Sequence, residues 1–379
     1  MRNKVKKIKV GVVFGGRSGE HEVSIVSAQA VMQALNPNTY EVIPIGITKQ
    51  GSWVAGAEAV KFLKDGISKL PYKTFLPADP TSHELVAVAE EGSGKLPAWE
   101  LDVIFPVLHG PYGEDGTIQG MLELANIPYV GGGVLGSAVA MDKVIQKHLC
   151  GSAGIAQVAY VPLLASAWQQ DRNTCVAEIE NKLAYPIFTK PANLGSSVGI
   201  TKCHNQAELL HGLDQAAKFD RKIIVEQGIE SPREIEVSVL GNDQPRASVP
   251  GEIIPSNEFY DYDAKYVDGK SAEKIPAELP KAVIQKIQAI AIQAFKTLDL
   301  AGMARVDFLV ARDSQDIYLN EVNTIPGFTS ISMYPKLWQA SGLLYPQLLD
   351  RLIELAFERH QRKNQLATSY TPKTDWHKD

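Results

Sequence analysis

A strand–helix–strand pattern fills the first 47 of the 379 residues and most constrains how this chain can fold. Residues 7–14 are almost continuously apolar and predict a buried strand, which Gly15 and Gly16 end. Apolar residues then recur at helical spacing from Ile25 to Leu35, and residues 41–47 predict a second strand. Because two strands joined by a crossover helix run parallel, we expect the first domain to carry a parallel sheet.

The composition is that of an ordinary globular protein and excludes several classes of function. Hydrophobic residues make up 45% and charged residues 21% of the chain, unlike a disordered protein. The net charge of −5 argues against nucleic acid as the main partner, because nucleic-acid-binding domains are usually basic. No stretch reaches the roughly 18 uninterrupted apolar residues of a membrane span, so we expect no membrane partner. The three cysteines form no CxxC pair, and a reducing cytoplasm is the expected location.

Beyond the first unit, the pattern predicts two further α/β units and one irregular insertion. Residues 51–98 are rich in proline and turn residues and indicate an excursion on the same first domain. We expect one helix over residues 137–150 and a last one over about residues 342–358. Residues 256–276 form a long polar loop, and such loops in compact domains are usually functional lids or disordered. Residues 365–379 are a polar tail.

Four polar residues on two predicted strands near the C-terminus form the best candidate site. Period-2 alternation places Arg305 and Asp307 on one face of the first strand, and Glu321 and Asn323 on one face of the second. If Asp307 lies opposite Glu321, two carboxylates and an amide oxygen converge, and these are the hard ligands that Mg²⁺ takes. Arg305 beside such a metal could neutralise a transferring phosphoryl group. The alternative, of equal weight on spacing alone, is the solvated face of an antiparallel sheet with surface ion pairs.

Two loops rich in small residues are further candidates for ligand binding. Lys190 ends a predicted strand and precedes a loop of small residues that runs to Gly199, whose free N–H groups could surround phosphate oxygens. This segment lacks the GxxxxGK[ST] pattern of a P-loop, and an ordinary hairpin turn is the alternative. The loop at residues 15–20 follows the first strand, where open α/β sheets bind ligands. It lacks GxGxxG, so a dinucleotide-dependent dehydrogenase is disfavoured.

Three isolated titratable residues have both a functional and a structural interpretation. Glu20 could hold an ammonium group, or be a helix N-terminal carboxylate that the macrodipole favours. His109 follows a buried strand and is by default a hydrogen-bonded structural histidine, and Lys143 is by default a solvated lysine on a helix. None of these residues is decisive alone, and it is their order along the chain that indicates a function.

From about residue 7 to about residue 358 the sequence resembles the D-alanine–D-alanine ligase family of the ATP-grasp superfamily. The resemblance is carried by GGRSGEHEVS, HGPYGEDG, MDK, KPANLGSSVG, YDYDAKY and NEVNTIPGFT, at residues 15–24, 109–116, 141–143, 190–199, 260–266 and 320–329. So many long motifs in the family's order are not expected by chance.

The resemblance implies an α/β fold with a three-domain ATP-grasp architecture. An N-terminal parallel α/β domain at residues 1–133 would bind the first D-alanine. Two α+β domains would clamp ATP: a central domain at residues 134–228 and a C-terminal domain at residues 229–364, with the metal site and the lid at residues 256–276. The polar tail at residues 365–379 would follow.

Individual roles also follow from the matched motifs. The implied ATP-binding residues are Lys143 and Lys190 at the phosphates, Glu226 and the backbone through Gln227 to Ile229 at adenine, Glu234 at the ribose, and Ser197 and Lys265. The implied substrate-binding residues are Glu20 and His109 for the first D-alanine, and Ser332 and the backbone of Met333 for the second. Arg305 and the N–H of Gly327 would stabilise the acyl phosphate and the oxyanion. Ser196 and Tyr266 would join Glu20 in a hydrogen-bonded triad that ties down the lid. Asp307, Glu321 and Asn323 would bind two Mg²⁺ ions, or Mn²⁺ in their place, with Glu321 bridging.

The implied activity is ATP-dependent ligation of two D-alanine molecules through D-alanyl phosphate, for peptidoglycan precursor synthesis, by a cytoplasmic homodimer. The physics agrees, because cations must offset the repulsion between a carboxylate and a triphosphate. Acyl phosphates hydrolyse, so a lid that excludes water is expected. A ligase of the same fold with D-lactate or D-serine as acceptor is the alternative, and an intact Tyr266 favours the dipeptide. A non-catalytic nucleotide-binding module is disfavoured, because the metal and arginine positions are all filled.

Overall fold

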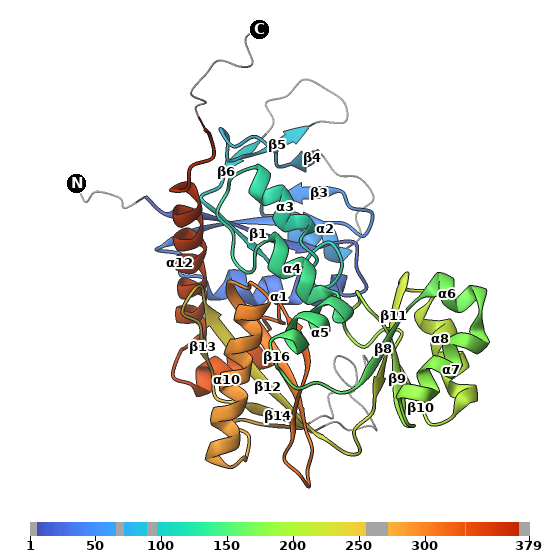
Figure 1. Ribbon diagram of the computed structural model, residues 1–379. Coiled ribbons are helices and arrows are strands. Elements are labelled where there is room, and N and C mark those ends of the chain that lie inside the picture. Colours follow the sequence, from blue (N-terminus) through green and yellow to red (C-terminus); the bar gives the residue numbers. More distant parts are fainter. Residues whose placement is uncertain (1–5, 66–71, 89–96, 255–271, 330, 371–379) are drawn as a thin grey trace.

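Three β-sheets organise the chain in the computed structural model, which describes residues 6–65, 72–88, 97–254, 272–329 and 331–370 (Figure 1). The sheets come from successive stretches of sequence, and helices cover them, so the expected α/β class is confirmed. None of the helices in these ranges is both long and apolar enough to cross a membrane.

The first sheet is parallel where the sequence predicts a strand–helix–strand unit. Strands β1 (Ile8–Gly15), β2 (Tyr40–Ile47) and β7 (Val103–Pro106) pair in parallel, with β1 in the centre. Helix α1 (His21–Ala34) makes the crossover. The sheet order is β6-β5-β4-β3-β2-β1-β7. The carboxyl ends of β1, β2 and β7 therefore meet at one edge, where α/β sheets bind ligands.

The described parts of residues 51–98 extend the first sheet as antiparallel strands, in agreement with an excursion on the same domain. The added elements are β3 (Trp53–Ala55), α2 (Ala59–Asp65), β4 (Lys73–Phe75), β5 (Glu84–Val88) and β6 (Ala98–Glu100). The sheet is consequently mixed rather than wholly parallel.

One expected helix is two helices. After α3 (Thr117–Leu124), the chain forms α4 (Val134–Met141) and α5 (Lys143–Ser152) where we expected a single helix over residues 137–150. Asp142 between them is extended, and its side chain accepts hydrogen bonds from the N–H groups of Val144 and Ile145. This N-cap starts a new helix and orients Lys143 at its first position.

The second sheet, of order β10-β9-β11-β8, presents one apolar and one charged face. Its strands are β8 (Tyr160–Leu164), β9 (Ile187–Pro191), β10 (Thr201–Cys203) and β11 (Lys222–Gln227). The helices α6 (Ala165–Gln170), α7 (Arg172–Lys182) and α8 (Gln206–Ala216) form an apolar core with Ile223 and Val225. Because neighbouring residues on a strand face opposite ways, Glu226 lies on the face away from these helices.

The third sheet contains the long polar-faced strands near the C-terminus, in the order β15-β14-β12-β16-β17. Its strands are β12 (Arg233–Gly241), β13 (Arg246–Ala247), β14 (Gly251–Ile254), β15 (Ala272–Lys274), β16 (Gly302–Val310) and β17 (Ile317–Asn323). Helix α10 (Lys281–Thr297) covers one face with Ile287, Ala291 and Phe295. The other face carries the polar residues and also Leu240 and Met303, which pack against the last helices.

The first and third sheets share one apolar core through the last helices. Helix α11 (Met333–Ala340) was not predicted, and α12 (Tyr345–Asn364) starts later and runs further than the expected residues 342–358. Leu348, Leu352 and Leu355 of α12 pack in one cluster with Val10 and Val103 of the first sheet. Figure 1 shows α12 running along the side of this sheet. The loops after β1, β7 and β17 are therefore held close together. The domain boundaries at residues 133 and 228 stay a prediction.

Candidate active site

The strand pair β16–β17 has the register that the candidate metal site requires. Asp307 lies directly opposite Glu321, and Arg305 lies opposite Asn323. The register shifts between Asp307 and Phe308, which lets Glu321 share a face with Asp307 while the apolar residues of both strands stay in the core. The predicted convergence of four polar side chains is confirmed.

Arg305 joins the carboxylates on this face. Its Nε and one terminal nitrogen donate to the two Asp307 oxygens at 2.8 and 2.7 Å, and its Nε lies 3.1 Å from Glu236 Oε2. Burial alone would lower the pKa of Arg305, but Asp307 and Glu236 outweigh it and raise the pKa well above its usual value. Sequence reasoning missed Glu236, although it alternates with Glu234 on β12.

The donor set fits a hard divalent cation. Asn323 Nδ2 donates to Asp307 Oδ2 at 2.9 Å, so an amide and two carboxylates lie side by side. No group of three His, Cys, Asp or Glu side chains placed for a metal occurs among the described residues, so the amide oxygen would have to serve as the third ligand. Carboxylate and amide oxygens, completed by water or phosphate, are the ligands that Mg²⁺ takes.

Lys143 connects this face to the small-residue loop that follows β9. Its Nζ donates to the carbonyl of Leu194 at 2.8 Å and lies 3.6 Å from Glu321 Oε2. Its backbone N–H donates to the carbonyl of Ala192 at 3.0 Å. Two segments predicted to bind phosphate and metal are thus in contact, and Lys143 is buried rather than solvated.

A second buried charge cluster lies on the charged face of the second sheet. Lys190 Nζ donates to Glu226 Oε2 at 2.6 Å, and Lys147 Nζ lies 3.3 Å from Glu226 Oε1. Burial would raise the pKa of Glu226, but the two lysines lower it to about 2. Burial lowers the pKa of Lys147, and Glu226 only partly opposes this. Sequence reasoning missed Lys147, although it follows Lys143 by one helical turn on the same face.

Lys190 and Gln227, both predicted to bind ATP, differ in their relation to this cluster. The charges of Glu226, Glu321 and Glu234 outweigh burial and raise the pKa of Lys190. The side chain of Gln227 instead bonds to the backbone of Ala184, donating at 2.7 Å and accepting at 2.9 Å. Its backbone N–H donates to the carbonyl of Ala159 at 2.8 Å, so the side chain and the N–H of Gln227 are both occupied.

Glu20 sits where three loops meet. Ser196, which has a left-handed backbone, donates a hydrogen bond from its Oγ to Glu20 Oε1. A Cβ atom on Gly110 or Gly195 would lie 2.6 or 2.8 Å from Glu20 Oε2, so both loops approach the carboxylate as closely as glycine permits. The contact between Glu20 and Ser196 agrees with two members of the predicted triad. The third, Tyr266, lies outside the described residues, as does Lys265.

His109 has protein partners at both ring nitrogens. Its Nδ1 lies 3.0 Å from the carbonyl oxygen of Ile325, and its Nε2 lies 3.2 Å from Ser27 Oγ. Because a carbonyl only accepts, Nδ1 carries the proton. Burial lowers the pKa of His109, which favours the neutral ring. This is the structural interpretation of His109, and its contact with a substrate stays a prediction.

Glu114 ties the same two loops together and was also missed. Its Oε1 accepts from the N–H of Gly110 at 2.9 Å, and its Oε2 accepts from the N–H of Ile325 at 3.0 Å. Burial and the nearby Glu20 charge raise the pKa of Glu114 to about 7. Its place in the HGPYGEDG motif was the available signal.

Ser332, Met333 and Gly327 lie together at the start of α11. Ser332 is the N-cap residue, and its Oγ accepts from the N–H of Thr329 at 3.0 Å. A Cβ atom on Gly327 would lie 2.8 Å from Ser332 Oγ, so the loop folds back tightly on the helix start. The Met333 side chain is buried, which leaves its backbone for a ligand. Free N–H groups at a helix start favour anions.

A cavity of about 190 Å³ lies at the carboxyl ends of the parallel strands, beside His109. Gly16, Ile47 and Leu108 line it from the three strand ends. Its position agrees with the edge of the sheet at which ligands were predicted to bind.

Comparisons with known proteins cover nearly the whole chain. Two family models match, "D-ala D-ala ligase N-terminus" over residues 9–132 and "D-ala D-ala ligase C-terminus" over residues 149–354. The D-alanine–D-alanine ligase of Natranaerobius thermophilus is 50% identical over 368 residues, which are 97% of this chain and 100% of that protein. That of Heliobacterium modesticaldum is 49% identical over 367 residues, 97% of this chain and 99% of its own.

Solved structures of ligases are similar to this chain over nearly its whole length. The D-alanine–D-alanine ligase from Coxiella burnetii has a TM-score of 0.81 at 36% identity, over 95% of this chain and 97% of that one. The D-Ala:D-Ser ligase VanG from Enterococcus faecalis has a TM-score of 0.80 at 37% identity, over 93% of this chain and 100% of that one. These structures carry the ATP-grasp fold that the sequence predicts. On this combined likeness in sequence and fold, the chain belongs to the D-alanine–D-alanine ligase family.

Proposed function

We propose that this protein joins two D-alanine molecules, with ATP consumed to ADP and phosphate, to make D-alanyl-D-alanine for peptidoglycan precursors. The observation that carries the proposal is the contact between Lys143 and Glu321, at 3.6 Å, beside the Arg305–Asp307 pair. Lysine and arginine cations and acidic metal ligands from three parts of the chain meet there. That is the charge arrangement needed when a triphosphate approaches a carboxylate.

In this proposal, each charged group has a separate task in the first step. Lys143 and Lys190 neutralise the triphosphate, and Arg305 stabilises the phosphoryl group as it moves to the substrate carboxylate. Two Mg²⁺ ions, or Mn²⁺, would be held by Asp307, Glu321 and Asn323, and would supply further neutralisation of the phosphates. The product of the step is D-alanyl phosphate, which is electrophilic where a free carboxylate is not.

The second step uses groups on the loops that follow β1, β9 and β17. Glu20, supported by Ser196, holds the ammonium group of the first D-alanine. Ser332 and the first N–H groups of α11 receive the carboxylate of the second D-alanine, and the N–H of Gly327 stabilises the tetrahedral oxyanion. The amine of the second D-alanine attacks, the C–O bond to phosphate breaks, and inorganic phosphate leaves.

The direct test is a product assay with mass detection. Purified protein is incubated with ATP, Mg²⁺ and D-alanine, and we expect dipeptide and phosphate in equal amounts. Reactions with EDTA, or with L-alanine, should give neither. Wild-type protein that releases no phosphate and makes no dipeptide would overturn the proposal.

Acceptor choice is tested by competition, because the solved relatives include a D-Ala:D-Ser ligase. D-Alanine competes with D-lactate across a range of pH, and with D-serine at a single pH. If D-alanine is the preferred acceptor, the share of D-alanyl-D-alanine over D-alanyl-D-lactate should rise with pH, since a protonated amine is a poor nucleophile. Dominant D-alanyl-D-lactate or D-alanyl-D-serine would favour the alternative acceptors.

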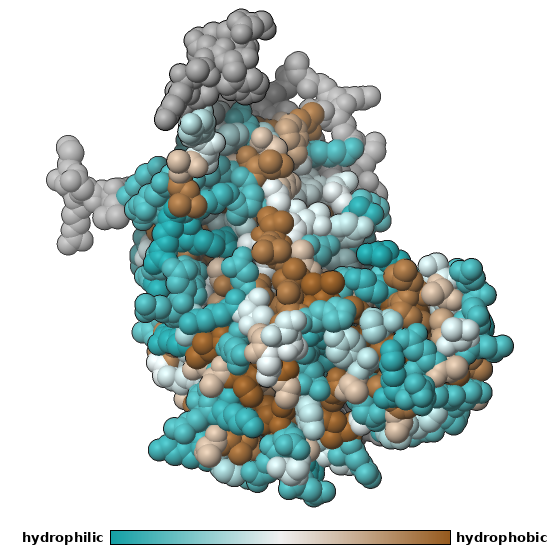
Figure 2. Space-filling view, in the orientation of Figure 1, coloured by the Kyte–Doolittle hydropathy of each residue, from teal (hydrophilic) through white to brown (hydrophobic). Residues whose placement is uncertain are grey.

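We infer that the protein acts as a homodimer through the face formed by α3, α4 and α5. Figure 2 shows apolar residues along the centre of this face, over these helices. The exposed apolar side chains are Leu124, Val134, Leu135, Ile145 and Leu149. Contiguous apolar surface of this kind marks interfaces, and a second copy is the occupant in most small oligomers. Light scattering should give a dimer that Leu135→Asp converts to a monomer, whereas a monomeric wild-type protein would refute the inference.

We also infer a cytoplasmic location. Cys150, Cys175 and Cys203 are all free thiols, and two of them are buried. Free thiols are expected in a reducing compartment. Fractionation of the source cells, with the protein recovered in the soluble cytoplasmic fraction, is the test.

A further inference from the structure

A buried lysine that the reaction does not use shares the carboxylate of Glu226 with Lys190. The two lysines bind different oxygens: Lys190 Nζ lies 2.6 Å from Oε2, and Lys147 Nζ lies 3.3 Å from Oε1. Lys147 is 1% exposed and Glu226 is 3% exposed. The two lysines therefore contact the carboxylate separately, so Glu226 keeps one cationic neighbour if the other lysine moves away.

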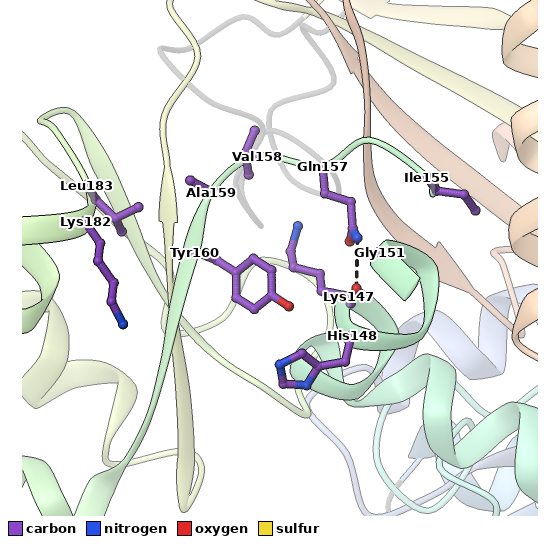
Figure 3. Close-up of a pocket in the computed structure, with 10 residues that line it drawn as sticks. All are labelled: Lys147, His148, Gly151, Ile155, Gln157, Val158, Ala159, Tyr160, Lys182 and Leu183. Atoms are coloured by element: carbon purple, nitrogen blue, oxygen red, sulfur yellow. Dashed lines mark hydrogen bonds between the residues drawn. The ribbon is translucent and has the colours of Figure 1, made fainter. Parts of the chain in front are cut away.

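The two lysines differ in their burial and in their surroundings. Lys147 projects from α5 beside a cavity of about 570 Å³, with its ammonium 5.7 Å from the ring centre of Tyr160 (Figure 3). Gln157 donates a hydrogen bond to the Lys147 carbonyl at 2.9 Å and anchors that turn of the helix. Lys190 is on β9, and its side chain is 13% exposed against 1% for Lys147, so Lys190 is the lysine that is open to a ligand.

We propose that Lys147 is a positioning residue for base recognition, holding Glu226 ionised and oriented when Lys190 moves to the phosphates, so that the site selects a 6-aminopurine over a 6-oxopurine. The inference rests on the proposed function and on the prediction that Glu226 contacts adenine. Among described residues, Lys147 Nζ makes no well-aligned hydrogen bond, which leaves its charge as its contribution to Glu226.

The chemistry of selection follows from the protonation of Glu226. An ionised carboxylate only accepts hydrogen bonds, so it pairs with the amino group at C6 of adenine. Hypoxanthine presents a carbonyl there, and two acceptors would face each other without a proton between them. Without Lys147, a buried Glu226 that has lost Lys190 would take up a proton, and its O–H could then donate to that carbonyl.

The test compares nucleotide binding in the full-length protein, without turnover. Dissociation constants for ADP and for IDP, each with Mg²⁺, are measured by calorimetry for the wild type and Lys147→Met. We expect ADP binding to weaken about tenfold or more, equivalent to about 1.4 kcal/mol. IDP binding should change little, so the ADP-to-IDP preference should fall by about the same factor. Equal weakening of ADP and IDP would mean a merely structural role and would overturn the proposal.

Three further variants sharpen the result. Lys182→Met removes an exposed lysine that lines the same cavity and pairs with Glu178, and it should leave both constants unchanged. In a Glu226→Gln background, Lys147→Met should not alter the preference further, because the carboxylate through which it acts is gone. Lys147→Arg keeps the charge and should keep most of the preference, which provides a readout if the methionine variant does not fold. A further loss in the Glu226→Gln background, or the same loss in Lys147→Arg as in Lys147→Met, would contradict the proposal.

The outcomes separate this inference from the proposed function. Wild-type protein that binds ADP and IDP equally contradicts the role of Lys147, whatever the protein ligates. Wild-type protein that prefers ADP but makes no dipeptide contradicts the proposed function and leaves the role of Lys147 intact.

Discussion

The N–H of Ile325 donates to Glu114 Oε2 at 3.0 Å, across 211 positions of sequence. The other Glu114 oxygen accepts from Gly110 at 2.9 Å, and His109 Nδ1 donates to the carbonyl of Ile325 at 3.0 Å. The loop after β7 and the loop after β17 are thus joined by a short run of hydrogen bonds. These hydrogen bonds between the two loops hold Glu20 and Gly327 in position relative to each other.

Glu114 should make the stability of the fold depend on pH. Its pKa in the folded protein is about 7, raised from an ordinary value of 4.5. The folded state therefore holds a proton that the unfolded chain releases between these values. The stabilisation is complete below about pH 4.5 and is lost as pH rises to about 7, with a slope of at most about 1.4 kcal/mol per pH unit. Glu114→Gln, which cannot titrate, should flatten this part of the profile.

Denaturant unfolding of the wild type and Glu114→Gln at pH 5, 6 and 7 measures how the free energy of unfolding of each depends on pH. The control is Glu58→Gln, at an exposed glutamate outside the junction, which should keep the wild-type slope. Identical slopes in Glu114→Gln and the wild type would show that Glu114 is not protonated in the folded protein.

Asp307→Asn should abolish phosphate release while the protein stays folded. The change removes one of two opposed carboxylates, and we expect the rate to fall by about 10³-fold or more, as when a charge-stabilising group is lost. Arg305 keeps Glu236 at 3.1 Å, so its charge is not stranded. Phosphate release as a function of Mg²⁺ concentration is the measurement, with Asp313→Asn in the exposed turn as the control. A wild-type rate in Asp307→Asn would remove the metal assignment.

Gly195→Ala should weaken binding of the first D-alanine and spare the nucleotide. The new Cβ would lie 2.8 Å from Glu20 Oε2, so the carboxylate must move away from its position beside Ser196. We expect the KM for D-alanine to rise about tenfold, the effect of losing roughly one charged hydrogen bond. Steady-state kinetics and ADP calorimetry separate the two effects. Gly120→Ala is the matched control, because its Cβ would meet no atom within 4 Å.

Arg359→Met should loosen α12 from the first sheet. Arg359 donates to the carbonyls of Tyr129, at 3.1 Å, and Gly131, and its guanidinium lies 4.1 Å from the Tyr129 ring centre. Leaving two buried carbonyls without donors should cost about 2–4 kcal/mol of the free energy of unfolding. Urea unfolding measures this loss of free energy. The control is Arg362→Met, at an exposed arginine paired with Asp243, which should lower the free energy of unfolding far less. Equal costs would mean that α12 does not depend on this contact.

Elements with a strong local pattern could be predicted from the sequence. The strand–helix–strand unit at β1, α1 and β2 follows from apolar periodicity, and so does the polar face that carries Asp307 and Glu321. The break at Asp142 was missed because apolar spacing continues through residues 137–150, and an N-cap is a matter of one side chain. Helix α11 was missed because its first turn contains Pro335 and follows an irregular loop.

The sequence by itself determined the family, the parallel core of the first sheet and the identity of most charged groups near the proposed chemistry. Only the tertiary structure decided that Lys147 reaches Glu226, that Glu114 reaches Ile325, and that α12 packs on the first sheet. Periodicity records which face of an element is apolar, and that is a local property. Which buried charge meets which depends on how separate elements dock, and the docking depends on apolar contacts between segments far apart in the chain.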